Sequence, residues 1–260
     1  MAPGTVALRE ETRRGWLREN KIEPEISFVI PCYNEARRLE PGFSSAMKFL
    51  LSRLGEKFEV ILVNDGSTDN TSEVLREVKR RNSSIPIDII EYGINRGKGF
   101  AVKTGVLSSR GQKIVQSDAD FSIDLEEAIK FLSYLDEYDI VIGTKKHQET
   151  ESLRHQSLAR RFLGKGFTLL TNFWLGINFS DITCGLKAFR REAALDIFSR
   201  QRLERWSYDA EILYLAVRRN YKILERPVRW QHVEGSKVMP LLDIVRSFKE
   251  LMAIRFYHRL

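Results

Sequence analysis

Four short polar clusters carry the side chains of this sequence that are best suited to chemistry. Three of them directly follow apolar, β-branched runs at residues 26–30, 60–63 and 113–117, and the fourth leads into a helical pattern. If those runs are neighbouring parallel strands, the clusters meet at one edge of a sheet, where such folds bind ligands. The clusters are Pro31-Cys32-Tyr33-Asn34-Glu35, Asn64-Asp65-Gly66-Ser67-Thr68-Asp69, Asn95-Arg96-Gly97-Lys98-Gly99 and Ser117-Asp118-Ala119-Asp120.

The acid pair Asp118 and Asp120 suits a divalent metal. With a strand period of two, both carboxylates can point to the same side. A hard cation such as Mg²⁺ takes one or two carboxylates together with phosphate oxygens and water. An isolated Asp-x-Asp is more often a pair of solvated loop acids, but the position after a strand, in register with the other clusters, favours a metal site here.

The loop around Lys98 and the acid Asp65 are weaker signals. Backbone N–H groups at the start of a helix, together with a lysine, suit phosphate binding. The loop matches neither a Walker A motif nor a dinucleotide fingerprint, and a simple turn explains it equally well. Asp65 is placed to accept hydrogen bonds from a nucleobase or ribose, or to form a turn. Asp209 begins a helical pattern, where an acid also complements the helix dipole.

The elements that must position these clusters follow an alternating order. Strands are expected at residues 26–30, 60–63, 87–90, 113–117 and 140–143, with 186–189 as a further candidate, and amphipathic helical patterns lie between them. Such alternation predicts an α/β fold with a doubly wound, mostly parallel sheet. We expect a single domain at residues 25–239, an N-terminal extension at 1–24 and a C-terminal amphipathic helix at 240–260.

Composition limits the partners and the compartment. The 42 Lys and Arg against 35 Asp and Glu give a net charge of +7 over 260 residues, which favours anionic partners. No recognised nucleic-acid-binding motif is present, so nucleic acid is not expected. Two cysteines make no disulfide framework and fit a reducing compartment. No run approaches the roughly 18 apolar residues of a membrane span, so we expect a cytoplasmic protein without a span of its own.

Taken together, the clusters resemble the inverting family-2 glycosyltransferases of the nucleotide-diphospho-sugar transferase (GT-A) fold, from about Ile26 to Lys237. The second half narrows the resemblance. Residues 181–189, Asp-Ile-Thr-Cys-Gly-Leu-Lys-Ala-Phe, resemble the polyprenyl-phosphate branch of that family. Residues 204–211 and 234–237 are similar to the dolichyl-phosphate β-glucosyltransferases. The sister mannose synthases usually carry an amide at the position of Asp209.

The resemblance implies a role for each motif residue. Lys98 would lie near the donor phosphates, and Ser236 and Lys237 would fold over the diphosphate. The metal, Mg²⁺ or Mn²⁺, would be bound by Asp118 and Asp120. The nucleoside would be held by Pro31, Tyr33, Asn34, Glu35 and Asp65, and the lipid phosphate by Lys145, Arg160 and Arg161.

The acceptor decides the role of Asp209. A lipid monophosphate has a second pKa of about 6, so its attacking oxygen is already ionised at neutral pH and needs no base. Asp209 would then be a third metal ligand, which we favour. If the acceptor is a hydroxyl, Asp209 is the best candidate base. UDP-glucose is the favoured donor and GDP-mannose its rival. A nucleotidyltransferase would instead carry a glycine-rich loop at residues 31–35.

Two segments suit a membrane surface. Residues 145–178 contain six Lys and Arg against two Glu, and an aromatic run at 167–179 begins just after the last of these cations. At the C-terminus, apolar residues recur at helical spacing. This helix is expected either in an anionic membrane interface on the cytoplasmic face or packed on the core or in a homodimer. The apolar positions of the stripe are Leu241, Ile244, Val245, Phe248, Leu251 and Met252.

Overall fold

A seven-stranded sheet forms the centre of the structure, a computed structural model that describes residues 23–145, 158–230 and 240–258. Within these ranges the side chains of Pro41 and of residues 158–163 and 240–245 are outside the description. The strand order is β3-β2-β1-β4-β6-β5-β7. The strands are β1 (Ile26–Cys32), β2 (Phe58–Asp65), β3 (Ile87–Tyr92), β4 (Lys113–Gln116), β5 (Ile140–Thr144), β6 (Lys187–Arg190) and β7 (Ile223–Pro227).

Only β6 runs against its neighbours among the described strands; it is antiparallel to both β4 and β5, and the other pairings are parallel. The mostly parallel α/β sheet expected from the alternating pattern is therefore confirmed. Strand β7 was not expected. Its sequence, Ile-Leu-Glu-Arg-Pro, is only partly buried and pairs on one side alone, at the edge of the sheet. Such an edge strand needs no apolar alternation.

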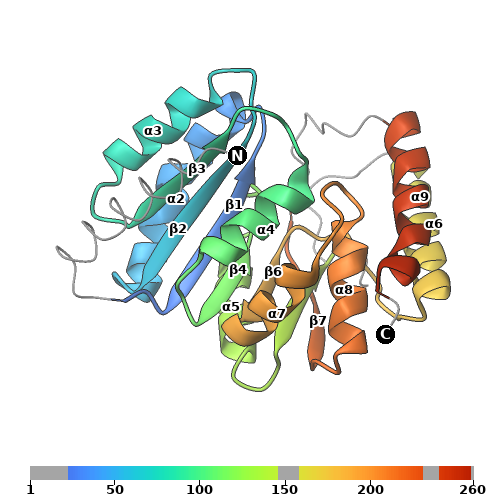
Figure 1. Cartoon of the computed structure of the whole chain (residues 1–260). Coiled ribbons are helices and arrows are strands. Elements are labelled where there is room, and N and C mark those ends of the chain that lie inside the picture. The colour runs from blue at the N-terminus through green and yellow to red at the C-terminus, as the bar shows by residue number, and fades with distance from the viewer. Residues whose placement is uncertain (1–22, 146–157, 231–239, 259–260) are drawn as a thin grey trace.

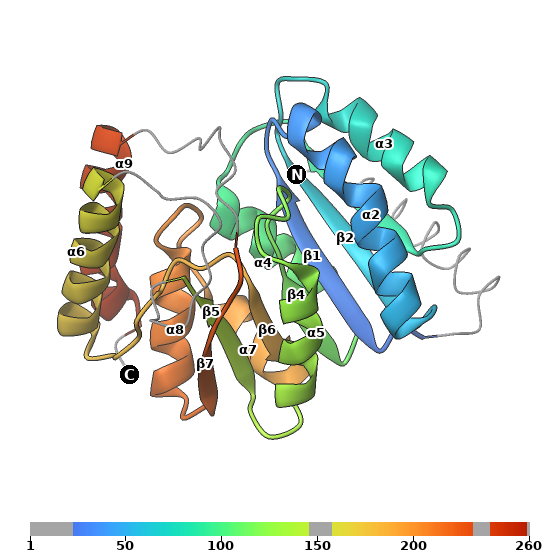
Figure 2. The ribbon, with the colours of Figure 1, turned by 180° about the vertical axis from the view of Figure 1, so that it is seen from behind.

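Helices cover both faces of the sheet, and two further helices lie side by side beyond α8 (Figures 1 and 2). One face is covered by α2 (Ala36–Leu54), α3 (Thr71–Arg81) and α5 (Leu125–Tyr134). The other is covered by α4 (Lys98–Ser108), α7 (Arg191–Arg200) and α8 (Tyr208–Arg218). The outer pair is α6 (Leu158–Leu175) and α9 (Pro240–Tyr257).

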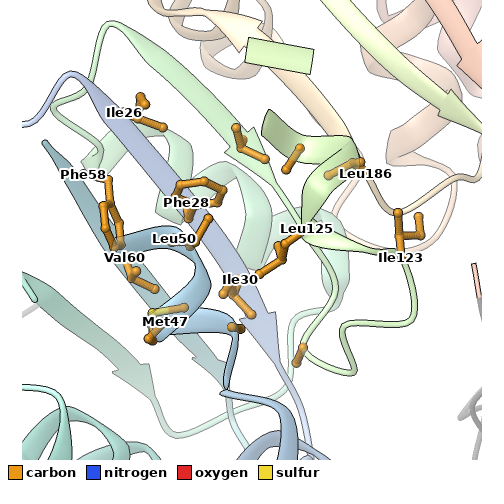
Figure 3. Packing of buried hydrophobic residues seen from close by; sticks show 14 of the residues in the cluster. Ile26, Phe28, Ile30, Met47, Leu50, Phe58, Val60, Ile123, Leu125 and Leu186 are labelled. Carbon is orange, nitrogen blue, oxygen red and sulfur yellow. The ribbon is translucent and has the colours of Figure 1, made fainter. Parts of the chain in front are cut away.

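Strand β1 shows why the sheet is apolar on both faces. Phe28 and Ile30 point toward α2 and α5, while Val29 between them points toward α4. Phe28 meets Phe58 of β2 edge to face, with ring centroids 5.9 Å apart (Figure 3). A strand buried on two faces requires a continuous apolar run, which is what the sequence of β1 provides.

Strand β1 also continues through Pro31, where the sequence predicted its end. Ser117 donates its N–H to the carbonyl of Val29, so Val29 and, two residues later, Pro31 face β4. The ladder between β1 and β4 ends at Gln116, beside Val29. Pro31 has no N–H to donate, and at its position no β4 residue of the ladder remains to receive one.

The C-terminal helix α9 packs on the core, which is one of the alternatives expected for it. Leu251 and Ile254 of α9 are fully buried in the core next to α8, whereas Phe248, Phe256 and Tyr257 are exposed. One side of α9 therefore packs on the core. None of the helices in the described ranges combines the length and the apolar character that crossing a bilayer requires.

Candidate functional site

Asn34 ties the cluster after β1 to the cluster after β2. Its φ of +53° turns the chain sharply, and its side-chain Oδ1 accepts the N–H of Thr68 at 2.8 Å. Its own N–H donates to Ser67 Oγ at 2.9 Å. The next residue, Glu35, donates its N–H to Thr71 Oγ1 at 2.8 Å and accepts two bonds from Arg38, at 2.6 and 2.8 Å. The two strand ends thus form one rigid edge.

Asp65 ties the same edge to the loop before α4. Only 2% of its surface is exposed. Its carboxylate accepts the N–H groups of Arg96 and Gly97, at 2.9 and 2.8 Å, and the side-chain amide of Asn95 at 2.8 Å. Gly97 has a φ of +113°, a conformation that favours glycine. Asp65 therefore holds the phosphate-loop candidate in place, and its contact with a nucleoside stays a prediction.

Lys98, the first residue of α4, reaches the acid pair. Its Nζ donates to Asp118 Oδ1 at 2.6 Å, and the two side chains are 17% and 29% exposed. Asp120 accepts the N–H of Ser122 at 3.0 Å and lies 3.9 Å from Arg38. Trp206 borders the same place, with its ring 5.9 Å from Lys98 Nζ. This pair is therefore partly accessible from solvent.

Asp209 lies deeper, in the first turn of α8. Lys187 Nζ donates to Asp209 Oδ1 at 2.5 Å and to the carbonyl of Cys184 at 2.6 Å. Lys187 lies within the motif at residues 181–189, but the motif alone predicted no role for it. Its signal was a lysine inside the apolar run of β6, because a buried lysine requires an acid partner.

Electrostatics joins these groups into one cluster. Burial opposes the charge of Lys98, but the carboxylates of Asp118, Asp209 and Asp120 outweigh it and raise the pKa of Lys98 above its usual range. Burial likewise raises the pKa of Asp118, but Lys98, Lys145 and Lys187 outweigh it, so this pKa is lowered. Asp118 is therefore ionised, and Lys98 charged, at neutral pH.

Asp118 and Asp120 fit a metal held by two carboxylates. In the ranges that the structure describes, no three Asp, Glu, His or Cys side chains come together as a metal site. Asp118 and Asp120 are partly exposed and fit an ion that completes its shell with phosphate oxygens and water. Asp209, which was expected as the third ligand, has one oxygen bonded to Lys187.

The remaining predicted residues are placed in part. Pro31 and Tyr33 are partly buried at the end of β1. Lys145 follows β5; its N–H donates to Asp181 at 3.1 Å, and its Nζ lies 5.5 Å from the centroid of the Trp230 ring. The side chains of Arg160 and Arg161, in the first turn of α6, and all of Ser236 and Lys237 lie outside the described residues.

Most of the chain matches one protein family. Residues 27–198 match the model described as glycosyl transferase family 2. The chain belongs to this family. It is 38% identical over 242 residues to dolichyl-phosphate β-glucosyltransferase of Mus musculus, covering 89% of this chain and 75% of that protein. The Saccharomyces cerevisiae protein of the same name is 36% identical over 264 residues, covering 94% and 78%.

This family-2 member also has the GT-A fold predicted from the sequence. Glucosyl-3-phosphoglycerate synthase from Mycobacterium tuberculosis, solved with Mn²⁺, uridine diphosphate and glucosyl-3-phosphoglycerate, matches with a TM-score of 0.60 and 16% identity, covering 98% of this chain and 84% of that one. A mannosyltransferase from Pyrobaculum calidifontis, solved with GDP-Man and Mn²⁺, matches with a TM-score of 0.56 and 19% identity, covering 96% and 76%. The protein is a glycosyltransferase similar to the dolichyl-phosphate β-glucosyltransferases.

Proposed function

We propose that this enzyme transfers glucose, with inversion, from UDP-glucose to dolichyl phosphate or another polyprenyl phosphate at the cytoplasmic face of a membrane. The observation that carries the proposal is the accessible Lys98–Asp118 pair, with Asp120 beside it, at the edge of the sheet. The names of the relatives support the sugar and the acceptor. The transferase domain is taken as residues 25–239.

The donor half of the reaction needs a site for a diphosphate. Lys98 supplies a cation that stays charged, and the N-terminus of α4 supplies backbone N–H groups for phosphate oxygens. A divalent cation, Mg²⁺ or Mn²⁺, on Asp118 and Asp120 would neutralise the charge that develops on the leaving diphosphate. Pro31, Tyr33, Asn34, Glu35 and Asp65 form the rigid edge on which the nucleoside would lie.

The acceptor half needs a cation but no base. A phosphate monoester is ionised at neutral pH, so its oxygen can attack the sugar carbon directly, in line with the departing diphosphate. The charge of Lys145 helps to lower the pKa of Asp118, and Lys145 would supply a cation for the incoming phosphate. Arg160, Arg161, Ser236 and Lys237 are proposed on the resemblance alone. A hydroxyl acceptor would instead require a base.

The outer helices supply the proposed membrane contact. Leu169 and Phe173 of α6 are 73% and 84% exposed, and Lys165 beside them is exposed and basic. Arg255 of α9 lies 5.5 Å from the ring of Trp174, so cations line this apolar surface. Apolar side chains mixed with cations suit an anionic lipid surface.

Vesicle binding tests the contact. We expect the protein to co-sediment with anionic phosphatidylserine vesicles and Phe173→Asp to weaken binding about tenfold. Leu107→Asp, at an exposed leucine of α4, is the matched control. Equal binding by wild type and Phe173→Asp would reject this surface, and a dimer broken by Phe173→Asp would assign it to a homodimer.

Donor competition tests the reaction. UDP-glucose, UDP-N-acetylglucosamine and GDP-mannose are each offered with polyprenyl phosphate and Mg²⁺, and with a polyprenol as the hydroxyl acceptor. We expect transfer from UDP-glucose to the phosphate alone, lost on chelation with EDTA and in Asp118→Ala/Asp120→Ala. No transfer from any donor, or unchanged transfer in that variant, would refute the proposal. Preference for GDP-mannose would make the enzyme a mannose synthase.

A further inference from the structure

Two polar side chains lie side by side beneath the acid pair, inside the sheet. Gln116 of β4 and Lys187 of β6 are direct partners in the antiparallel ladder. Both are fully buried. Burying such polar groups in a core costs free energy unless they form hydrogen bonds. Their hydrogen-bond partners therefore show which parts of the chain they fix in place.

Each of them bonds one of two consecutive residues of α8. Gln116 Nε2 donates to the hydroxyl of Tyr208 at 2.7 Å, and Lys187 Nζ donates to Asp209 Oδ1 at 2.5 Å. The side chains of Lys187 and Asp209 are 0% and 5% exposed. The first turn of α8 is therefore fixed to the centre of the sheet by one neutral and one charged bond.

Each of them also bonds the backbone of the segment before β6. Lys187 Nζ donates to the carbonyl of Cys184 at 2.6 Å, and Gln116 Nε2 donates to that of Gly185 at 3.4 Å. Gly185 lies directly against the acid pair, since a Cβ built on it would be 1.9 Å from Asp118 Oδ2. The place of Asp118 thus depends on a segment that Lys187 holds.

We propose that Lys187 is a positioning residue of the transferase site, and that Asp209 serves as its buried counterion rather than as a base. Lys187 fixes the Cys184–Gly185 backbone against Asp118 and is kept in place by Asp209. This role rests on the proposed function, because it concerns the placing of Asp118 for transfer. It also explains why an acid, and not an amide, stands at position 209 of this chain.

The pair makes a distinctive prediction for single and double variants. Removing one partner of a buried ion pair leaves an unpaired charge, whereas replacing both by neutral groups of similar volume does not. Lys187→Met and Asp209→Asn should each lower kcat about 100-fold, the usual effect of misplacing a reacting group by about 1 Å. The KM for UDP-glucose should stay within about threefold of the wild type. Lys187→Met/Asp209→Asn should recover to within about tenfold of the wild-type kcat.

The outcomes separate the alternatives. If Asp209 acts on the acceptor or on a metal, Asp209→Asn and the double variant lose activity equally, which would overturn the proposal. Lys113 of β4 and Asp136, in the turn after α5, provide the control, because they form a further lysine–aspartate pair at 2.6 Å that is exposed at the surface. Lys113→Met, Asp136→Asn and their double variant should keep the wild-type kcat.

Thermal unfolding tests the pair without any assay of transfer. Each single variant should lower Tm by roughly 10 °C, and the double variant by clearly less than the sum. Additive losses would refute the pairing even if transfer by the wild type fails. A wild type without transfer but with coupled Tm values would refute the proposed function and keep the pairing.

Discussion

Two lysine–aspartate pairs stand close together in this protein, and they differ in access to solvent. Lys98 and Asp118 are 17% and 29% exposed, whereas Lys187 and Asp209 are 0% and 5% exposed. Lys98 begins α4, directly after a loop held by Asp65, while Lys187 begins the central strand β6. In the proposed reaction, the first pair separates when a phosphate or a metal arrives. The second pair is too deeply buried to do so, and it holds the backbone that lies against Asp118.

The difference in burial gives the same two side-chain types different roles. At the partly exposed Lys98–Asp118 pair, here called the open pair, solvent reaches both side chains, so separating them costs less than in the core. At the buried Lys187–Asp209 pair, here called the closed pair, separation would leave an unpaired charge in the core. Variants of the open site should therefore cost activity, while variants of the closed pair should cost stability as well.

Asp118→Asn should break the open pair with the largest loss of activity. We expect kcat to fall about 1,000-fold, because the amide neither pairs with Lys98 nor binds a cation as a carboxylate does. Tm should change by only a few degrees, since the side chain is partly exposed. Steady-state transfer and thermal unfolding measure both. A variant that retained more than a tenth of the wild-type kcat would contradict this role.

Gly185→Ala should disturb the open pair by displacing Asp118. The added methyl group would meet the Asp118 carboxylate, so we expect kcat to fall about 100-fold as the carboxylate moves. Gly166→Ala is the matched control, because a Cβ at Gly166 of α6 meets nothing within 4 Å. That variant should keep full activity and gain about 0.5–1 kcal/mol in the free energy of unfolding. Equal kcat values for the two variants would show that Gly185 does not constrain Asp118.

Asp65→Asn should act on the open site through the loop that precedes Lys98. The amide cannot accept from the N–H groups of both Arg96 and Gly97 while Asn95 also donates to it. We expect the KM for UDP-glucose to rise about tenfold, with a smaller effect on kcat. Isothermal titration with UDP measures the loss directly. Unchanged affinity for UDP would show that this loop does not contribute to donor binding.

Alkylation of the Cys184 thiol should reveal changes at the closed pair, and this is the smallest of the expected effects. Burial raises the pKa of its thiol to about 11, so the wild type should resist alkylation at pH 8. In Lys187→Met the backbone at Cys184 loses its bond, and mass spectrometry should find this residue labelled about tenfold faster. Rapid labelling of the wild type would contradict a closed site.

The same pKa predicts the direction of a pH effect. An unfolded thiol ionises near pH 8.5, so burial of the neutral thiol stabilises the fold below that pH. The contribution is lost as the pH rises from about 8.5 toward 11. Cys184→Ala should therefore lose less unfolding free energy than the wild type over this interval, as chemical denaturation at each pH would show.

The sequence predicted the open site better than the closed one. Asp118 and Asp120 stand two residues apart after a strand, and Lys98 opens a helix, so local spacing and the carboxyl-end rule place them together. The pairing of Lys187 with Asp209 spans 22 residues and two elements. It depends on which strand lies beside β4, and the periodicity of a single strand does not contain that information.

The fold class was also predictable from local sequence patterns, whereas the strand order was not. The alternation of apolar runs with amphipathic helices indicated a mostly parallel sheet, which the structure confirms. The antiparallel direction of β6 and the edge strand β7 did not follow from it. Residues such as Glu225 and Arg226 in β7 are charged because that strand pairs on one side only.

The position of β6 has a consequence for how the chain folds. Consecutive strands usually pair as they emerge, yet β6 enters between β4 and β5 after α6 has been made. Until it does, both of those strands keep an unpaired edge, and such contacts between distant segments form slowly. Lys187 enters the sheet with β6, and the Cys184–Gly185 backbone reaches Asp118 in the same step. A nascent chain that ends before β6 therefore contains the loop before α4 and both Asp118 and Asp120, but it lacks the strand whose Lys187 holds the backbone against Asp118.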